Sequence, residues 1–355
     1  MSKASFPLHT LQEGEHPAET QGDQRTLAAL KERYAFRITD HLKNMIEGLP
    51  ESDPIARQYL PQLAELDTLP EERADPIGDF AHTPVKGIVH RHKDRVLFKP
   101  ANICAVYCRF CFRREMVGPG ADILSMQERQ EALAYIAAHP EIREVILTGG
   151  DPLVLSVRQL DEILSALDAI SHLDMIRIHT RLPLADPGKI TAALCSILGK
   201  LQKPLYLSLH VNHTRELTPE VRQAIAALDK AGCILLSQSV LLKGVNDSAE
   251  TLEALFRTLI TLKVKPYYLH HPDLAPGTNH FRLSLSEGQA LFKKLQGRVS
   301  GICLPTYMLD IPGGYGKVPV TADHIKPLKD GTYIVTDNEG REHAYPESAQ
   351  TGNTA

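Results

Sequence analysis

The sequence predicts an α/β fold: a partial TIM-like (β/α)6 barrel with an N-terminal helical region and a small C-terminal β appendage. Six short runs rich in β-branched and aromatic residues alternate with helical patterns of about 10–15 residues, as in repeated βα units with a parallel sheet. Polar residues stand at or near the end of every run, and the carboxyl ends of parallel strands are where chemistry gathers. The chain has 355 residues, 43% of them hydrophobic and 23% charged, and can bury a large core.

The first part of the chain differs from the alternating region. Residues 1–25 are polar and predict a loose tail, and residues 24–66 have a charged helical pattern that three prolines interrupt. Residues 70–87 are rich in Pro and Asp, which predicts a connecting segment. We therefore expect residues 1–84 to form a tail and a helical region ahead of the barrel.

The alternating region predicts the barrel core over residues 85–285. Its predicted strands cover residues 95–99, 144–148, 175–180, 204–210, 234–240 and 265–270. The predicted helices cover about 125–138, 157–169, 187–198, 219–231, 249–262 and 286–296. Residues 286–355 are expected to form a C-terminal segment, in which short runs joined by DG and NEG turns predict antiparallel strands.

Composition and charge exclude several classes of function. The net charge of −4 gives no electrostatic reason to expect nucleic acid or an anionic membrane as a partner. The N-terminus lacks the apolar run of a secretory signal, and no stretch of about 18 apolar residues could span a membrane. Six cysteines in this length do not form a disulfide framework and suit a reducing compartment, so we expect a cytoplasmic protein.

Three of the six cysteines lie close together in CAVYCRFC, at Cys104, Cys108 and Cys111. In a protein of this class such spacing indicates metal binding or catalysis. A structural zinc ion normally takes four ligands, and the other three cysteines are scattered among apolar residues, as small buried hydrophobes are. Three cysteines on one loop suit a 4Fe–4S cluster with one open iron. A zinc site completed by a distant histidine is the alternative.

A second informative stretch is LDIPGGYGKVPV, in which glycines precede a single lysine, Lys317. Pyridoxal phosphate (PLP) needs such a lysine for a Schiff base. A lysine after glycines is also common as a solvated loop residue, so this stretch indicates a PLP site only in combination with the cysteine loop.

The cysteine loop, with Phe110 before its last cysteine, resembles the Cx3Cx2C signature of the radical S-adenosylmethionine (SAM) superfamily. GGDPL at 149–153 is similar to that superfamily's GGE-type strand end. Together with Lys317, the chain resembles the lysine 2,3-aminomutase family, whose members also use PLP. The matching stretches run in order from about residue 85 to 320: HRHKDRVLF (90–98), CAVYCRFCFRR (104–114), VILTGGDPL (145–153), RIHTRLPL (177–184), HVNH (210–213), QSVLLKGVND (238–247), KPYYLHHPDLAPGTNHFR (265–282) and PTYMLDIPGGYGK (305–317).

The resemblance implies roles in cofactor binding. Cys104, Cys108 and Cys111 would bind the 4Fe–4S cluster, and Lys317 would form the Schiff base with PLP. The residues implied near SAM are Gly149, Gly150, Asp151, His210 and Gln238, and those implied at the PLP phosphate are Arg91 and Arg95. The structural alternatives are turn glycines, a buried hydrogen-bonded His or Gln, and solvated arginines at the barrel rim.

The resemblance also implies three substrate residues. Arg113 would hold the α-carboxylate, a role that suits a forked guanidinium, and Asp273 and Asp310 would hold the ε-ammonium of lysine. Two neighbouring carboxylates repel each other unless a cation lies between them. The alternatives are a surface arginine and ordinary loop aspartates beside Pro and Gly.

The implied reaction is an isomerisation. The family interconverts L-lysine and β-lysine: a 5′-deoxyadenosyl radical abstracts a hydrogen from C3, and PLP carries the amino group from C2 to C3. The implied partners are the amino acid substrate and an electron donor such as flavodoxin or ferredoxin.

Two departures concern assembly. The chain has no cysteine after Cys303, whereas longer family members carry a zinc-binding one, and Ser248 stands where the family has a further zinc cysteine. We therefore expect no zinc between subunits and a homo-oligomer that differs from that of the longer members.

Three rival functions remain open. The length is similar to the branch that supplies β-lysine for elongation factor P, but that branch typically lacks the second substrate aspartate, which is present here as Asp310. A glutamate 2,3-aminomutase should lack the acidic pair formed by Asp273 and Asp310. An iron–sulfur electron carrier or a zinc-binding scaffold would leave Lys317 and Arg113 without a purpose.

Overall fold

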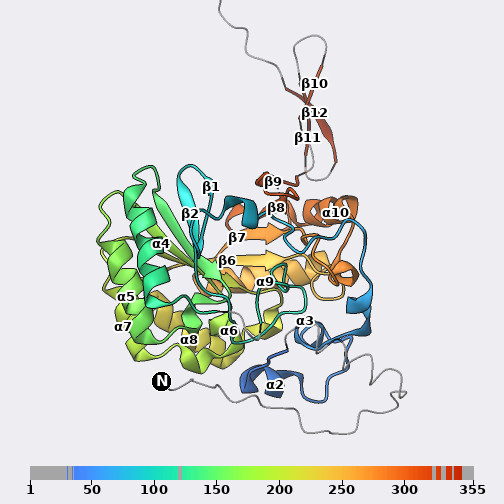
Figure 1. The fold of residues 1–355 in the computed structure, drawn as a ribbon. Coiled ribbons are helices and arrows are strands. Elements are labelled where there is room, and N and C mark those ends of the chain that lie inside the picture. The colour runs from blue at the N-terminus through green and yellow to red at the C-terminus, as the bar shows by residue number, and fades with distance from the viewer. Residues whose placement is uncertain are drawn as a thin grey trace, which may run out of the picture.

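The computed structural model of the protein describes residues 30, 34, 36–118, 122–321, 325–328, 333–337 and 340–345. Its main sheet has nine strands in the linear order β1-β2-β3-β4-β5-β6-β7-β8-β9 (Figure 1). The strands are β1 (Ile88–His92), β2 (Arg95–Ala101), β3 (Glu144–Gly149), β4 (Met175–Thr180), β5 (Leu205–His210), β6 (Ile234–Val240), β7 (Lys265–His270), β8 (Thr306–Asp310) and β9 (Lys317–Pro319).

Strands β2 to β8 are parallel to their neighbours, whereas β1 and β9 pair antiparallel at the two edges. In the part of the chain that the structure describes, β1 and β9 do not pair with each other, so the barrel is open. The predicted α/β fold with a partial barrel is confirmed, and all six predicted strands are present. Strand β8 is a seventh parallel strand that was not among the predicted strands.

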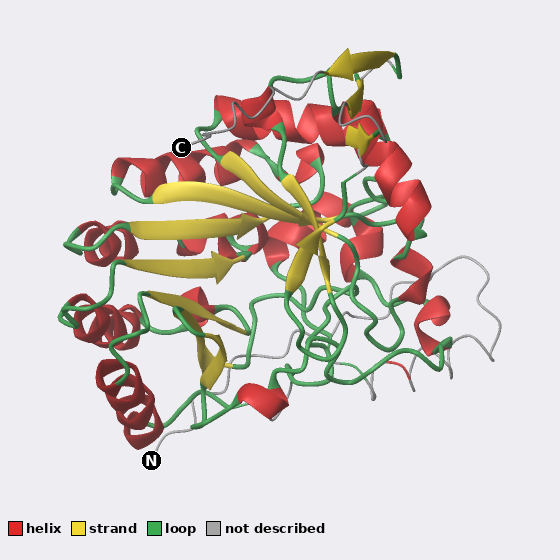
Figure 2. Cartoon of the chain, turned by 90° about the horizontal axis from the view of Figure 1, so that it is seen from above, coloured by secondary structure: helices red, strands yellow, loops and turns green. Residues whose placement is uncertain are grey.

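The helices that connect the strands lie on the outer side of the curved sheet (Figure 2). They are α4 (Met126–Ala138), α5 (Val157–Asp168), α6 (Leu182–Ala185), α7 (Ala192–Gly199), α8 (Pro219–Lys230), α9 (Ala249–Thr261) and α10 (Leu285–Leu295). A Ser or Thr side chain caps the amino end of most of them, for example Ser125 for α4 and Thr218 for α8. The main core forms between these helices and the sheet, where Leu147, Leu160 and Leu228 are fully buried.

The predicted single helix over residues 187–198 is wrong. The chain there forms a short 3-10 turn at Pro187–Lys189, and α7 begins only at Ala192. Pro and Gly both disfavour a helix interior, so the chain restarts at Thr191, whose Oγ1 accepts a hydrogen bond from the N–H of Leu194 at 3.2 Å.

The N-terminal helical region is short and packs on the cysteine loop. It contains α2 (Asp40–Ile46) and α3 (Ala56–Tyr59), which form a small core with Val106 and Ala185. This region therefore covers the cysteine loop at the C-terminal edge of the sheet. The division of the chain at residues 84 and 285 stays a prediction.

A separate three-stranded antiparallel sheet follows β9. Its strands are β10 (Ile325–Pro327), β11 (Tyr333–Thr336) and β12 (Glu342–Tyr345), and it projects from the body beside β9 (Figure 1). The predicted β appendage is confirmed. Among the described residues, no helix has the length and apolar character that crossing a membrane requires.

Candidate active site

The polar strand ends that the sequence indicated share one side of the sheet. Alternate side chains of a strand face opposite sides, and residues paired in register face the same side. His179 pairs with Ser208, and His210 pairs with Gln238, whereas the intervening Leu209 belongs to the core under the helices. The inner side therefore carries the polar residues Arg177, His179, Ser208, His210, Gln238, Tyr268, His270 and Asp310.

Cys104, Cys108 and Cys111 lie on the loop that follows β2, at the C-terminal edge of the sheet. All three are free, half-buried thiols that line one cavity of about 50 Å³. Burial and the neighbouring Cys108 raise the pKa of Cys111 to about 11, and burial also raises the pKa values of the other two thiols. A thiol with a raised pKa is a poor nucleophile, but a bound metal ion deprotonates a coordinating thiol. The loop therefore fits metal ligation better than thiol catalysis.

The geometry of these thiols bears on the kind of metal group. In the described part of the chain, no set of three or more His, Cys, Asp or Glu side chains is arranged to hold a single metal ion. The cysteines of an iron–sulfur cluster bind different irons and need not converge on one point. The three thiols line one cavity, as three ligands of one cluster would.

Arg181, which follows β4, contacts the cysteine loop directly. Its Nη1 donates a hydrogen bond to Cys108 Sγ at 3.1 Å, and its Nη2 donates to Glu216 Oε2 at 2.6 Å. Glu216 is 0% exposed, so the guanidinium is held in place by a buried carboxylate. Hydrogen bonds and charge at the ligating sulfurs set the reduction potential of an iron–sulfur cluster. No local motif marks this contact, because Arg181 and Glu216 lie 35 residues apart in the chain.

The GGD stretch at the end of β3 supports the start of the cysteine loop. A Cβ atom on Gly150 would lie 2.1 Å from the carbonyl oxygen of Ile103, so only glycine fits there. The carboxylate of Asp151 accepts hydrogen bonds from Thr180 Oγ1 and from the N–H groups of Leu153, Arg181 and Leu182. That carboxylate is fully engaged within the protein, so a contact with SAM at Gly149–Asp151 would use main-chain groups. The SAM role of this stretch stays a prediction.

Several polar atoms on the inner side are buried without a hydrogen-bond partner. They are His179 Nε2, Ser208 Oγ and His210 Nε2. Burial lowers the pKa values of His179 and His210 well below the usual value, which favours the neutral form of both imidazoles. Phe110 packs on His210 with ring centres 5.4 Å apart. A buried polar atom without a partner is costly, so this region fits a polar ligand next to the cysteine loop, with Gln238 beside His210.

Asp310 and Lys317 face each other across a hairpin. They are register partners in β8 and β9, and Lys317 Nζ donates a hydrogen bond to Asp310 Oδ2. The Asp310 side chain is 6% exposed and its Oδ1 has no partner, while the Lys317 side chain is 35% exposed. The amine therefore stands at the edge of the inner side, where a cofactor could reach it.

Asp273, in the loop after β7, completes an acidic pair with Asp310. Burial and the charge of Asp310 raise the pKa of Asp273 to about 7, and the charges of Lys317 and Arg113 oppose this rise. The structure thus brings together Arg113, Asp273, Asp310 and Lys317, which lie far apart in the sequence.

Arg113 and Arg91 converge on a carboxylate that the sequence analysis did not single out, Asp79. Arg113 Nη2 and Arg91 Nη2 each donate to it at 3.0 Å. Arg95 lies apart from this group, with a 37% exposed side chain that pairs with Asp94 at 2.9 Å. Of the two predicted phosphate ligands, Arg91 is thus anchored within the site and Arg95 is at its solvent side.

Comparison with known proteins gives a consistent picture. Residues 98–257 match the model of the Radical SAM superfamily. The chain is 37% identical over 329 residues to the L-lysine 2,3-aminomutase of Fusobacterium nucleatum subsp. nucleatum, covering 93% of this chain and 76% of that protein. It is 39% identical over 292 residues to the L-lysine 2,3-aminomutase of Escherichia coli (strain K12), covering 82% of this chain and 84% of that protein. The glutamate 2,3-aminomutase of Clostridioides difficile (strain 630) is 34% identical over 306 residues, with coverages of 86% and 72%.

The chain belongs to the lysine 2,3-aminomutase family. It is therefore a radical SAM enzyme of the isomerase class, and the superfamily implies a 4Fe–4S cluster and SAM. The three cysteines around one cavity and the unpaired polar atoms beside them fit these two groups. Lys317 and the buried Arg91 Nε, which has no partner, are consistent with PLP.

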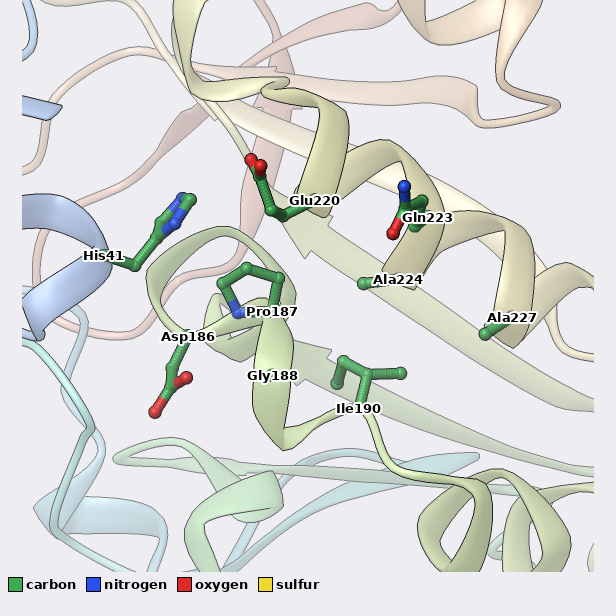
Figure 3. Close-up of a pocket in the computed structure, with 9 residues that line it drawn as sticks. All are labelled: His41, Asp186, Pro187, Gly188, Ile190, Glu220, Gln223, Ala224 and Ala227. Atoms are coloured by element: carbon green, nitrogen blue, oxygen red, sulfur yellow. The ribbon is translucent and has the colours of Figure 1, made fainter. Parts of the chain in front are cut away.

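A cavity larger than the one at the cysteine loop lies apart from the residues predicted to bind cofactor and substrate. It has a volume of about 470 Å³ and opens between α2, the Pro187–Lys189 turn and α8 (Figure 3). Its charged or titratable lining consists of His41, Asp186 and Glu220, and no residue predicted to bind cofactor or substrate lines it. Cavity size alone therefore does not locate the active site of this family member.

Proposed function

We propose that the protein is an L-lysine 2,3-aminomutase that interconverts L-lysine and β-lysine and uses PLP in addition to the cluster and SAM. The observation that carries this proposal is the acidic pair of Asp273 and Asp310 beside Lys317. The charge of Arg113 acts on the same pair, because it lowers the pKa of Asp273. Two carboxylates suit the side-chain ammonium of lysine, and an arginine suits the α-carboxylate. The proposal includes an external one-electron donor for the cluster, such as a flavodoxin or ferredoxin.

The residues of the chain would act by binding and positioning. When bound, the cluster with SAM supplies a 5′-deoxyadenosyl radical and PLP supplies the carbonyl that carries the amino group. Lys317 would hold the cofactor covalently until substrate displaces it. Asp273 and Asp310 would fix the far end of the substrate, and Arg113 its carboxylate, so that C3 lies at one defined place. The cysteine loop and the N-terminal helices that pack on it would exclude water from that place.

The direct test is reconstitution without oxygen. The protein is loaded with iron, sulfide and PLP, then given SAM, a reductant and either L-lysine or L-glutamate, and the products are identified by mass spectrometry. We expect β-lysine from lysine and no β-glutamate from glutamate. β-Glutamate would instead assign the chain to the glutamate-specific activity, and SAM cleavage without either product would leave a radical enzyme with another substrate.

The acidic pair also predicts how lysine binding depends on pH. The pKa of Asp273 is raised to about 7 by burial and by Asp310, so this carboxyl loses its charge as the pH falls through neutrality, while the ε-ammonium of lysine remains charged up to about pH 10. Lysine affinity should therefore be full above the pKa and fall by up to about tenfold for each pH unit below it. The Michaelis constant for lysine, measured on both sides of neutrality, reports this dependence.

The matched variant for that measurement is Asp273→Asn, which has a similar size and no titrating group. It should bind lysine weakly at all pH values, and its profile should be flat through neutrality. The same slope in this variant as in the unmodified protein would show that another group titrates.

A further inference from the structure

We propose that Asp79 is a positioning residue that fixes Arg91 and Arg113 relative to each other and to the loop that carries Lys317. The inference rests on the proposed function, since it takes Arg91 as a ligand of the PLP phosphate and Arg113 as a ligand of the substrate carboxylate. In the sequence, Asp79 lies in the Pro- and Asp-rich stretch that predicts only a connecting segment.

Asp79 is the centre of a buried charge cluster. The residue is 0% exposed. Its Oδ1 accepts a hydrogen bond from Arg91 Nη2 at 3.0 Å, and its Oδ2 accepts from Arg113 Nη2 at 3.0 Å and Nε at 3.2 Å. Lys99 Nζ lies 3.6 Å from the same Oδ2. Burial opposes ionisation of Asp79, but the charges of Arg113 and Lys99 outweigh it and lower the pKa of this carboxyl. One carboxylate thus organises three cations and leaves an excess of positive charge for anionic ligands.

The contacts leave one edge of each arginine available. Arg113 donates to Asp79 from Nε and Nη2, which form one edge of its guanidinium group. The Nη1 of Arg113 has only a long contact of 3.5 Å to Thr148 Oγ1. Arg91 gives Asp79 its Nη2, and its buried Nε has no partner. Because the two guanidinium groups occupy opposite oxygens of one carboxylate, the separation of their free donors is set by Asp79.

The segment that contains Asp79 also touches the glycine loop before Lys317. The N–H of Gly313 donates to the carbonyl oxygen of Pro76 at 3.0 Å. A Cβ atom on Gly78, whose φ is +68°, would lie 2.8 Å from the carbonyl carbon of Gly313, so the two backbones are in direct contact.

This arrangement matches the chemistry of the PLP and the substrate that would bind here. PLP spans a fixed distance from its phosphate to the carbonyl that Lys317 engages, and the substrate joins the cofactor through the amino group next to its carboxylate. The three protein groups that receive them must therefore keep a fixed spacing. The short segment 76–79 holds both arginines through Asp79 and packs on the glycine loop that leads to Lys317.

A second account of Asp79 predicts the opposite effect. If Asp79 only competes with anionic ligands for the arginines, removing its charge should tighten the binding of PLP and lysine. If it positions the arginines, removing its charge should weaken both.

The test is Asp79→Asn in the full chain, with and without the reconstituted cluster. Dissociation of PLP is measured by absorbance titration, and kcat and KM for lysine by product formation. We expect the PLP dissociation constant and the KM for lysine each to rise about 10- to 100-fold, as a misplacement of about 1 Å would produce. In Asp79→Glu, which keeps the charge, part of both losses should be recovered.

The effect on Arg113 can be isolated by a double-mutant cycle with Arg113→Lys. If Asp79 acts through Arg113, the KM effects of the two changes will not add. Additive effects, or tighter binding in Asp79→Asn, would overturn the inference.

Loss of folding must not imitate these results, so thermal unfolding is followed for every variant. The matched control is Glu72→Gln, which removes the charge of another buried carboxylate, 1% exposed, that anchors Arg282. This control should lower the melting temperature without changing the PLP dissociation constant. An equal rise of that constant in both variants would overturn the positioning role. Unmodified protein that binds no PLP would overturn the proposed function as well, whereas unchanged constants in Asp79→Asn beside active unmodified protein would overturn the inference alone.

Discussion

The Lys317→Ala variant is expected to lose roughly 10⁴- to 10⁶-fold of the aminomutase activity, the range observed when one member of a catalytic unit is removed. The amine of Lys317 donates a hydrogen bond to Asp310 Oδ2, in the acidic pair. Lys317 also follows the glycine loop that packs on residues 76–79. Without this amine, PLP has no covalent attachment in the site. Product formation is measured by mass spectrometry, and the absorbance of bound PLP reports the lost linkage.

The control for this variant is Lys326→Ala, which removes an exposed lysine from β10 in the same C-terminal segment. The control should keep both the activity and the PLP absorbance band. Iron content should be normal in both variants, since the cysteine loop is untouched. An unchanged PLP band in Lys317→Ala would move the cofactor to another lysine.

The Cys108→Ala variant should have the second largest effect, with no detectable product. Three cysteines line the cavity, and a cluster held by three protein ligands does not tolerate the loss of one. The change also removes the sulfur that accepts the hydrogen bond from Arg181 Nη1, which leaves a buried charge with one partner fewer. Bound iron and the visible absorbance of the cluster should fall to background.

Two further measurements separate this effect from general damage. PLP binding should persist in Cys108→Ala, because Lys317 and Arg91 lie on other elements. Cys195→Ala, which removes a half-buried thiol from α7, should retain iron and turnover. Full activity of Cys108→Ala without iron would falsify the radical mechanism.

The parts of the fold that follow from local pattern could be predicted from the sequence. The runs that became β2 to β7 are short and mostly apolar, and the helices begin at Ser or Thr caps such as Ser125 and Ser156. The cysteine triplet and the glycine-flanked Lys317 are likewise local signals. The break before α7 departs from the helix predicted over 187–198: Pro187 and Gly188 lie in a separate 3-10 turn, and α7 begins after its cap at Thr191.

The charge cluster could not be predicted, because it depends on the fold. Asp79 contacts residues 12 and 34 positions away, and its neighbours in the sequence indicate only a turn-rich stretch. Arg181 and Glu216 likewise meet across 35 residues of chain. A buried carboxylate and a solvated loop carboxylate are identical in sequence, and only the tertiary contacts distinguish them.

The ion pair across the β8–β9 hairpin implies an order of loading. The Lys317 ammonium donates a hydrogen bond to Asp310 Oδ2, on the same carboxylate that would receive the substrate's own ammonium. A free lysine molecule would have to compete with that cation for Asp310, whereas PLP bound to Lys317 would hold the amine in a covalent link and away from the carboxylate. The hairpin would thus hold the Lys317 amine at the place proposed for the substrate ammonium until the cofactor engages it, so we expect PLP to bind before lysine.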